Sequence, residues 1–196
     1  IKLILFACLL LIFICINLSY GSINIPLKSI LQTLIGNDVT KESWQYIILQ
    51  YRLPKAITAV LVGSGLSICG LLMQTLFRNP LAGPFVLGIS SGASLGVALL
   101  VLGISIFSGS IAGIAFSNLG IALAASLGAF FVLSAVMLVA KKVKNTMSIL
   151  IIGLMFGSFT AAIISVLAYF SSAENLQQYV FWTFGSLGNL GWDEIF

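Results

Sequence analysis

Long apolar runs separated by shorter polar stretches dominate the chain. A run of about 20 apolar residues lets a helix cross the hydrocarbon core of a bilayer, whereas the strands of a membrane barrel alternate apolar and polar residues. The chain has the first pattern, which predicts an all-α, polytopic transmembrane helical bundle. We expect about five spans, at residues 1–18, 56–77, 84–102, 120–140 and 147–170.

Two polar stretches are long enough to lie outside the membrane. Residues 19–55 include an amphipathic piece and are expected to form an external segment on the bilayer surface. Residues 171–196 alternate aromatic residues with glycine and polar groups, which is typical of an external interfacial segment. We expect one transmembrane domain over residues 1–196. It is expected to be incomplete, because the chain starts without methionine and stops within what resembles another element.

Basic residues give a weak indication of orientation. Arg78 follows the second run and KKVK (141–144) follows the fourth, and basic residues in short loops favour the cytoplasm. These ends and the amino terminus are therefore predicted to be cytoplasmic. The bias is small because four basic residues would lie outside: Lys28, Lys41, Arg52 and Lys55.

Composition excludes several classes of function. The chain is 60% hydrophobic, 7% charged and lacks histidine, and its three cysteines lie within apolar runs, so we predict no catalytic residue, no metal site and no cofactor of its own. The nine Lys and Arg are scattered, which argues against a nucleic-acid partner. No span carries an ionisable group at its centre, which counts against an ion-coupled carrier.

Small residues and prolines interrupt the apolar runs in a regular way. The pairs Asn79-Pro80 and Gly83-Pro84 predict a tight hinge between the second and third spans. Glycines at helical spacing predict close helix packing, at Gly63, Gly70, Gly88, Gly92 and Gly96. A similar stripe in the fifth span is either a packing seam or the lining of a substrate pathway, and consists of Gly153, Gly157, Ala161 and Ser165.

Two blocks of motifs resemble one known family. Residues 51–96 carry Arg52-Leu53-Pro54-Lys55, then Gln74, Asn79-Pro80-Leu81-Ala82, Leu87-Gly88 and Ser91-Gly92-Ala93. The second block carries Trp182, Gly185, Ser186 and Trp192. In order and spacing, both blocks resemble the FecCD-type permeases of ABC importers, which take up iron-siderophore complexes, haem and cobalamin.

The resemblance implies a ten-span, type II ABC importer permease in a bacterial cell membrane, of which this chain would supply the first five spans. It implies a second permease copy or a close paralogue, cytoplasmic subunits that bind ATP and Mg, and an external solute-binding protein. Arg52 and Lys55 would face outward and dock that protein, and the fifth span would line the pathway.

The implied function is passage of a metal chelate by alternating access, driven by the partner ATPases. A secondary, ion-coupled transporter would have similar broken helices and glycine hinges. A non-transporting membrane scaffold is a third interpretation of the same spans. The sequence leaves open the identity of the chelate and whether the permease pair is a homodimer.

Overall fold

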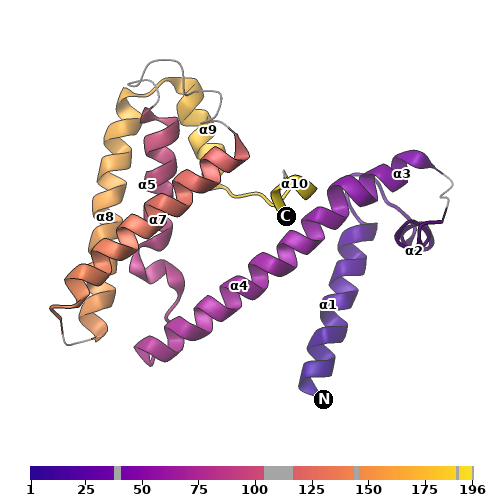
Figure 1. The fold of residues 1–196 in the computed structure, drawn as a ribbon, viewed down its shortest axis with the longest axis horizontal. Coiled ribbons are helices and arrows are strands. Elements are labelled where there is room, and N and C mark those ends of the chain that lie inside the picture. The colour runs from indigo at the N-terminus through magenta and orange to yellow at the C-terminus, as the bar shows by residue number, and fades with distance from the viewer. Residues whose placement is uncertain (38–40, 104–116, 144–145, 189, 196) are drawn as a thin grey trace. The chain divides into compact units, whose positions relative to one another are not determined.

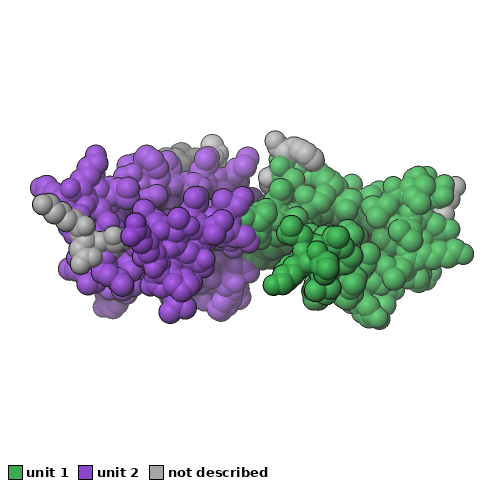
Figure 2. All heavy atoms as spheres, turned by 90° about the horizontal axis from the view of Figure 1, so that it is seen from below, with its two compact units in different colours: residues 1–65, 186–196 green, residues 66–185 purple. Residues whose placement is uncertain are grey.

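The computed structural model describes residues 1–37, 41–103, 117–143, 146–188 and 190–195. Within these ranges the chain forms helices and turns and contains no β-strand. It divides into two compact units, residues 1–65 with 186–196 and residues 66–185 (Figure 2). The boundary lies inside helix α4 (Leu53–Phe77), within a stretch, residues 59–69, that is exposed. The sequence pattern alone predicts one domain and does not reveal this division.

The first unit combines helices from the beginning and the end of the chain. It contains α1 (Lys2–Ser19), α2 (Leu27–Ile35), α3 (Glu42–Ile47), the π-helix η1 (Ile48–Arg52), the start of α4, and α10 (Trp192–Ile195). Its buried apolar side chains are Leu18, Ile25, Ile30, Ile48 and Ala56. The stretch expected as an external surface segment therefore folds into α2 and into a helical run that continues into α4.

Helix α2 is amphipathic, and its inner face is partly polar. Ser29, Ile30 and Thr33 are buried, at the three- and four-residue spacing of one helix face. The Thr33 hydroxyl donates to the Ser29 carbonyl at 2.9 Å, which satisfies its hydrogen-bonding capacity in a buried position. Gly36 ends the helix in the left-handed conformation with φ of 81°, which glycine adopts without steric cost.

The second unit is a small helical bundle. Helix α5 (Ile89–Val101) lies between α7 (Asn118–Ala140) and α8 (Thr146–Phe170), as Figure 1 shows. The short 3-10 helix η2 (Pro84–Leu87) precedes α5, and α9 (Ala173–Thr183) follows α8. A core cluster at one end joins the end of α4 to α7 and α8, with Met73, Phe77, Ala82, Leu87, Val132 and Val136 buried.

A second cluster closes the other end of this bundle. Val97, Ala98 and Val101 of α5 pack there with Tyr179 of α9. The Tyr179 ring stacks on Trp182 with their centroids 6.3 Å apart, and its burial raises the pKa of the phenol, against a smaller opposite effect of a hydrogen bond with Ser94. Helix α9 is thus held to α5 by the packing of Tyr179 against Val97, Ala98 and Val101 and by its hydrogen bond with Ser94.

Four helical runs are long and apolar enough to cross a membrane among the described residues: Lys2–Ser19, Glu42–Phe77, Asn118–Ala140 and Met147–Phe170. The third predicted span, at 84–102, is instead two elements, η2 and the 13-residue α5. Gly88 separates them with φ of 74°, a left-handed backbone that an α-helix cannot continue through. The second predicted span also begins earlier than expected, because α4 starts at Leu53, with Pro54 tolerated in its first turn.

Candidate functional site

Arg52, one of the two predicted docking residues, lies in a cage of main-chain carbonyls. Its Nη1 donates to the Leu18 carbonyl at 2.5 Å and to the Ser19 carbonyl at 2.9 Å. Its Nη2 donates to the Ile23 carbonyl. The side chain is only 8% exposed. The guanidinium therefore ties the end of α1, and the loop after it, to the π-helix.

The sequence around the cage explains why an arginine is held there. The last carbonyls of a helix have no donor within the helix, and the helix dipole makes that end negative. The flat fork of a guanidinium can reach two such carbonyls at once. Gly21 leaves the space for it, because a Cβ at this position would lie 2.9 Å from Nη2 of Arg52.

Two hydrogen bonds between Ser19 and Ile25 close the loop around the guanidinium. The Ser19 hydroxyl donates to the Ile25 carbonyl at 2.8 Å, and the Ile25 amide donates to the Ser19 carbonyl at 3.0 Å. These bonds fix residues 19–25 as a ring against which Arg52 rests. The carbonyl of Ser19 accepts from both Ile25 and Arg52.

The Arg52 side chain is buried, and the docking role expected for Arg52 and Lys55 stays a prediction. The guanidinium points into the first unit, where it donates to the carbonyls of Leu18, Ser19 and Ile23. Lys55, three residues later, is exposed in the first turn of α4. Of the predicted pair, Lys55 therefore presents its charge at the surface and Arg52 does not.

The predicted hinge residues are brought together in one turn after α4. Arg78 takes a positive φ of 47°, which ends the helix. The Asn79 side-chain oxygen accepts from the Leu81 amide at 3.0 Å, and its main-chain carbonyl accepts from the Ala82 amide at 3.1 Å. Asparagine favours turns for this reason.

Two further contacts complete the hinge. The Gln74 side chain donates to the Pro80 carbonyl at 3.1 Å. Gly83 is extended, and Pro84 follows it as the first residue of η2, the position that suits proline. The hydrogen bonds of this turn join the chain to itself, and the hinge role of Asn79, Pro80, Gly83 and Pro84 stays a prediction.

Three of the predicted packing glycines lie where helix backbones nearly touch. A Cβ at Gly92 would lie 2.7 Å from the Gly128 carbonyl oxygen, and a Cβ at Gly96 would overlap the Ala124 carbonyl oxygen. Gly88 approaches Gly153, whose carbonyl oxygen would be 3.1 Å from an added Cβ. At Gly92 and Gly96 a real Cβ would not fit without a backbone shift, so these two contacts need glycine. At Gly88 the added Cβ would be tight, and the positive φ of 74° is the further reason for glycine.

Gly63 and Gly70 differ from these three. Within the described chain, a Cβ on either residue would meet no other atom within 4 Å. Gly63 borders an apolar groove of about 430 Å³ between α1 and α4, with Phe13 and Val60 among its lining residues. Of the five predicted packing glycines, Gly63 and Gly70 therefore make no close helix contact within the described residues.

The stripe in α8 splits into two halves. Gly153 is buried, and a Cβ added there would overlap the Val86 carbonyl oxygen. Gly157 faces the Ser91 hydroxyl, 3.2 Å from an added Cβ. In this structure these two glycines therefore face η2 and α5, whereas Ala161 and Ser165 are exposed.

Gly128 and Ala124 of α7 are contact residues that the sequence pattern alone did not single out. The backbones of Gly128 and Ala124 lie directly against those of Gly92 and Gly96. Their spacing of four residues was the available signal, since small residues at this spacing allow tight helix crossings. In an apolar run rich in alanine and glycine, that signal does not stand out.

Within the described residues, no group of three or more Cys, Asp or Glu side chains could hold a metal ion. The three cysteines, Cys8, Cys15 and Cys69, are exposed free thiols on the helices.

Comparison with known proteins places the chain in a family. Residues 9–196 match the FecCD transport family. The chain belongs to this family.

Individual relatives agree with that assignment. The chain is 32% identical over 186 residues to the hemin transport system permease protein HmuU of Yersinia pestis, covering 94% of this chain and 54% of HmuU. It is 39% identical over 146 residues to the "Probable iron chelatin transport system permease protein" of Helicobacter pylori, covering 74% of this chain and 41% of that protein.

A solved structure has the same fold. It is described as a metal-chelate type ABC transporter in an inward-facing conformation, and it is 30% identical to this chain with a TM-score of 0.77. The similarity covers 98% of this chain and 56% of that one. The chain therefore spans about half the length of the relatives it matches.

Proposed function

We propose that this chain is part of the membrane-spanning permease subunit of an ABC importer for an iron-siderophore or a related metal chelate such as haem or cobalamin. The observation that carries the proposal is the match to the FecCD transport family over residues 9–196. The relatives are named for transport of haem and iron chelatin, which supports a chelate as cargo.

In this proposal the permease works by alternating access. Glycine contacts hold α5 against α7 and α8 with almost no space between backbones, so these helices are suited to move as one rigid body. The turn at residues 78–84 connects that body to α4. Partner subunits bind ATP and Mg and supply the energy, and this chain supplies passage and docking surfaces.

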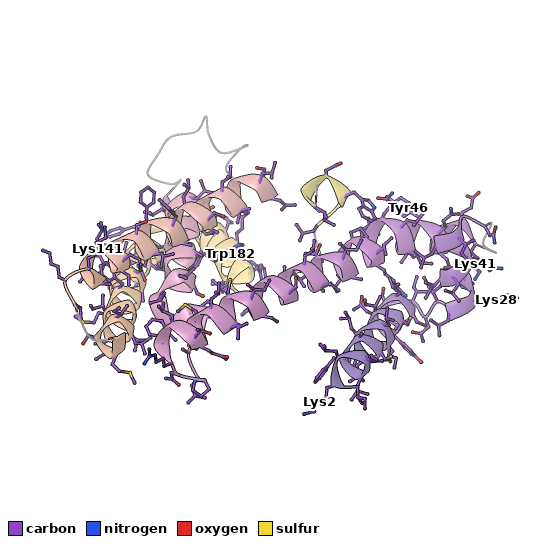
Figure 3. All side chains as sticks on the ribbon, turned by 60° about the horizontal axis from the view of Figure 1, so that its bottom comes forward. Lys2, Lys28, Lys41, Tyr46, Lys141 and Trp182 are labelled. Atoms are coloured by element: carbon purple, nitrogen blue, oxygen red, sulfur yellow. The ribbon has the colours of Figure 1, made fainter. Side chains whose placement is uncertain are left out.

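The proposed location is the bacterial cell membrane, with a second permease copy or paralogue completing the pathway. The amino terminus and the ends after α4 and α7 are proposed to be cytoplasmic. In Figure 3, Lys2 lies at the opposite end of the first unit from Lys28 and Lys41, as expected for residues on two sides of a membrane.

Docking of an external solute-binding protein is assigned to Lys55. Its charge is exposed at the start of α4, whereas that of Arg52 is bound by carbonyls. A carboxylate on the binding protein would be attracted to the exposed charge of Lys55. The loop around Arg52 would separate the same carboxylate from the guanidinium. The exposed half of the α8 stripe, Ala161 and Ser165, is the candidate pathway lining.

The docking assignment is tested with the permease expressed from its complete gene and assembled with its ATPase. We expect Lys55→Glu to reduce binding-protein stimulation of ATP hydrolysis, and Lys2→Glu, at the other end of α1, to leave it unchanged. Equal stimulation in both variants would remove Lys55 from the docking surface. Failure of any ATPase or binding protein to assemble with the permease would contradict the proposed function itself.

A further inference from the structure

The helical run before Pro54 leaves one carbonyl without a backbone donor. Residues Ile48–Arg52 form a π-helix, in which each amide donates to the carbonyl five residues earlier. The Leu53 amide accordingly donates to the carbonyl of Ile48 and not to that of Leu49. The next amide in this register would belong to residue 54, but proline has no N–H. The Leu49 carbonyl is therefore left without either of its usual partners.

Trp192 supplies the missing donor. Its indole Nε1 donates to the Leu49 carbonyl at 2.9 Å, across 143 residues of sequence. Figures 1 and 3 both place α10, which begins at Trp192, beside the junction of α3 and α4. The bond lies within the first unit, to which residues 186–196 and 1–65 both belong.

The hydrogen bond from Trp192 to Leu49 lies where it can also affect the orientation of Arg52 and Lys55. In sequence, the fully buried Pro54 lies between Arg52, which is held in its carbonyl cage, and Lys55, which is exposed. The π-helix decides which way these two side chains face, because one extra residue per turn rotates everything that follows it. A donor that satisfies the carbonyl of the π-helix favours this geometry over a regular α-helix.

We propose that Trp192 is a positioning residue, whose indole N–H replaces the amide that Pro54 lacks and so holds the π-helix that sets the orientation of Lys55. The consequence for docking rests on the proposed function, whereas the hydrogen bond itself does not. The tether also explains how a segment after α9 is kept against the start of α4.

The tether is tested first by unfolding of the permease, expressed from its complete gene, in detergent. Replacing Trp192 with 3-benzothienylalanine substitutes sulfur for the N–H and keeps the shape of the ring. We expect this change to shift the unfolding equilibrium about fivefold toward the unfolded state, the usual effect of one hydrogen bond. In a Pro54→Ala background the same change should have less than a twofold effect, because residue 54 then has its own N–H.

The positioning role is tested by docking of the solute-binding protein to the same variants. We expect Trp192→Phe to weaken docking about three- to tenfold, and Pro54→Ala in the Trp192→Phe background to restore it to within about twofold of the original protein. Trp182→Phe makes the same chemical change in α9 and serves as the matched control, with docking unchanged.

The unfolding and docking measurements test the tether and the positioning role separately. Equal losses on removing the indole N–H in the original and the Pro54→Ala backgrounds, or no loss in either, would overturn the tether. A coupled effect on unfolding with no effect on docking would overturn the positioning role and leave the bond as a purely structural one. Absence of docking in every variant, the original protein included, would count against the proposed function, while the unfolding measurements would still decide the tether.

Discussion

Arg52 illustrates how a charge can be part of the interior of a membrane protein. Removing a guanidinium from water is costly unless its donors are paired, and here three carbonyls receive it. Two of them, of Leu18 and Ser19, are at the end of α1, where the helix leaves carbonyls unpaired. The two costs offset each other: the helix end gains donors, and the arginine gains acceptors.

Removing the guanidinium should therefore destabilise the first unit much more than removing an exposed cation nearby. We expect Arg52→Met to lower the free energy of unfolding by about 2–4 kcal/mol, because the Leu18 and Ile23 carbonyls lose the guanidinium donor and the Ser19 carbonyl loses one of its two donors. The matched change Lys55→Met should stay within about 0.5 kcal/mol, since that side chain is exposed. Chemical unfolding of both variants in detergent measures the difference, and similar values for the two would refute the cage as a stabilising feature.

Helices α5, α7 and α8 depend on glycine for their mutual contacts. Gly96 and Gly128 are the tightest points, since a Cβ on Gly128 would overlap the Gly92 carbonyl oxygen. At so close an approach a side chain of any size forces the helices apart. The dispersion contacts along the seam would be lost with it, and dispersion is a main source of helix association within a bilayer.

Adding one methyl group should therefore have opposite effects at two kinds of glycine. We expect Gly128→Ala to lower the free energy of unfolding by about 1–3 kcal/mol through overpacking. Gly70→Ala, where a Cβ would meet nothing within 4 Å, should be neutral or stabilising by up to about 1 kcal/mol through helix propensity. Thermal unfolding of the two variants decides the matter, and an equal loss at Gly70 would mean that this glycine packs against parts of the protein outside this chain.

The sequence predicts the helices well and their contacts less well, for physical reasons. Apolar runs place α1, α4, α7 and α8 because crossing a bilayer requires length and hydrophobicity, which are local properties. The break at Gly88 depends on one backbone angle, and the orientation of Arg52 depends on carbonyls about 30 residues earlier. The hinge around Asn79 was predictable because turn chemistry is local, whereas the partners of Gly92 and Gly96 required the fold.

At the scale of the whole molecule, the arrangement of charges is consistent with one orientation. Met73 and Phe77 of α4 pack in the same cluster as Val132 and Val136 of α7, so the ends of both helices lie at one end of the bundle. Arg78 and Lys141 follow these ends directly and are exposed. From the positive-inside rule we propose that this end faces the cytoplasm.

Cysteine labelling tests this orientation. In a background with Cys8, Cys15 and Cys69 replaced by alanine, we expect a cysteine at Lys28 to react in intact cells with a maleimide that cannot cross the membrane. A cysteine at Lys141 should react only after the membrane is permeabilised, and one at Lys2 should behave in the same way. The reverse pattern would invert the topology, and with it the assignment of Lys55 to the external side.

We propose that this chain belongs to a permease powered by ATP hydrolysis in partner subunits. The most direct test of this proposal is uptake of a ferric siderophore, haem or cobalamin into proteoliposomes that contain the permease expressed from its complete gene, its ATPase and the binding protein. We expect accumulation of one of these chelates that requires ATP and Mg on the cytoplasmic side and continues when proton and sodium gradients are collapsed. Uptake that persists without ATP and stops when an ion gradient is removed would contradict the proposal.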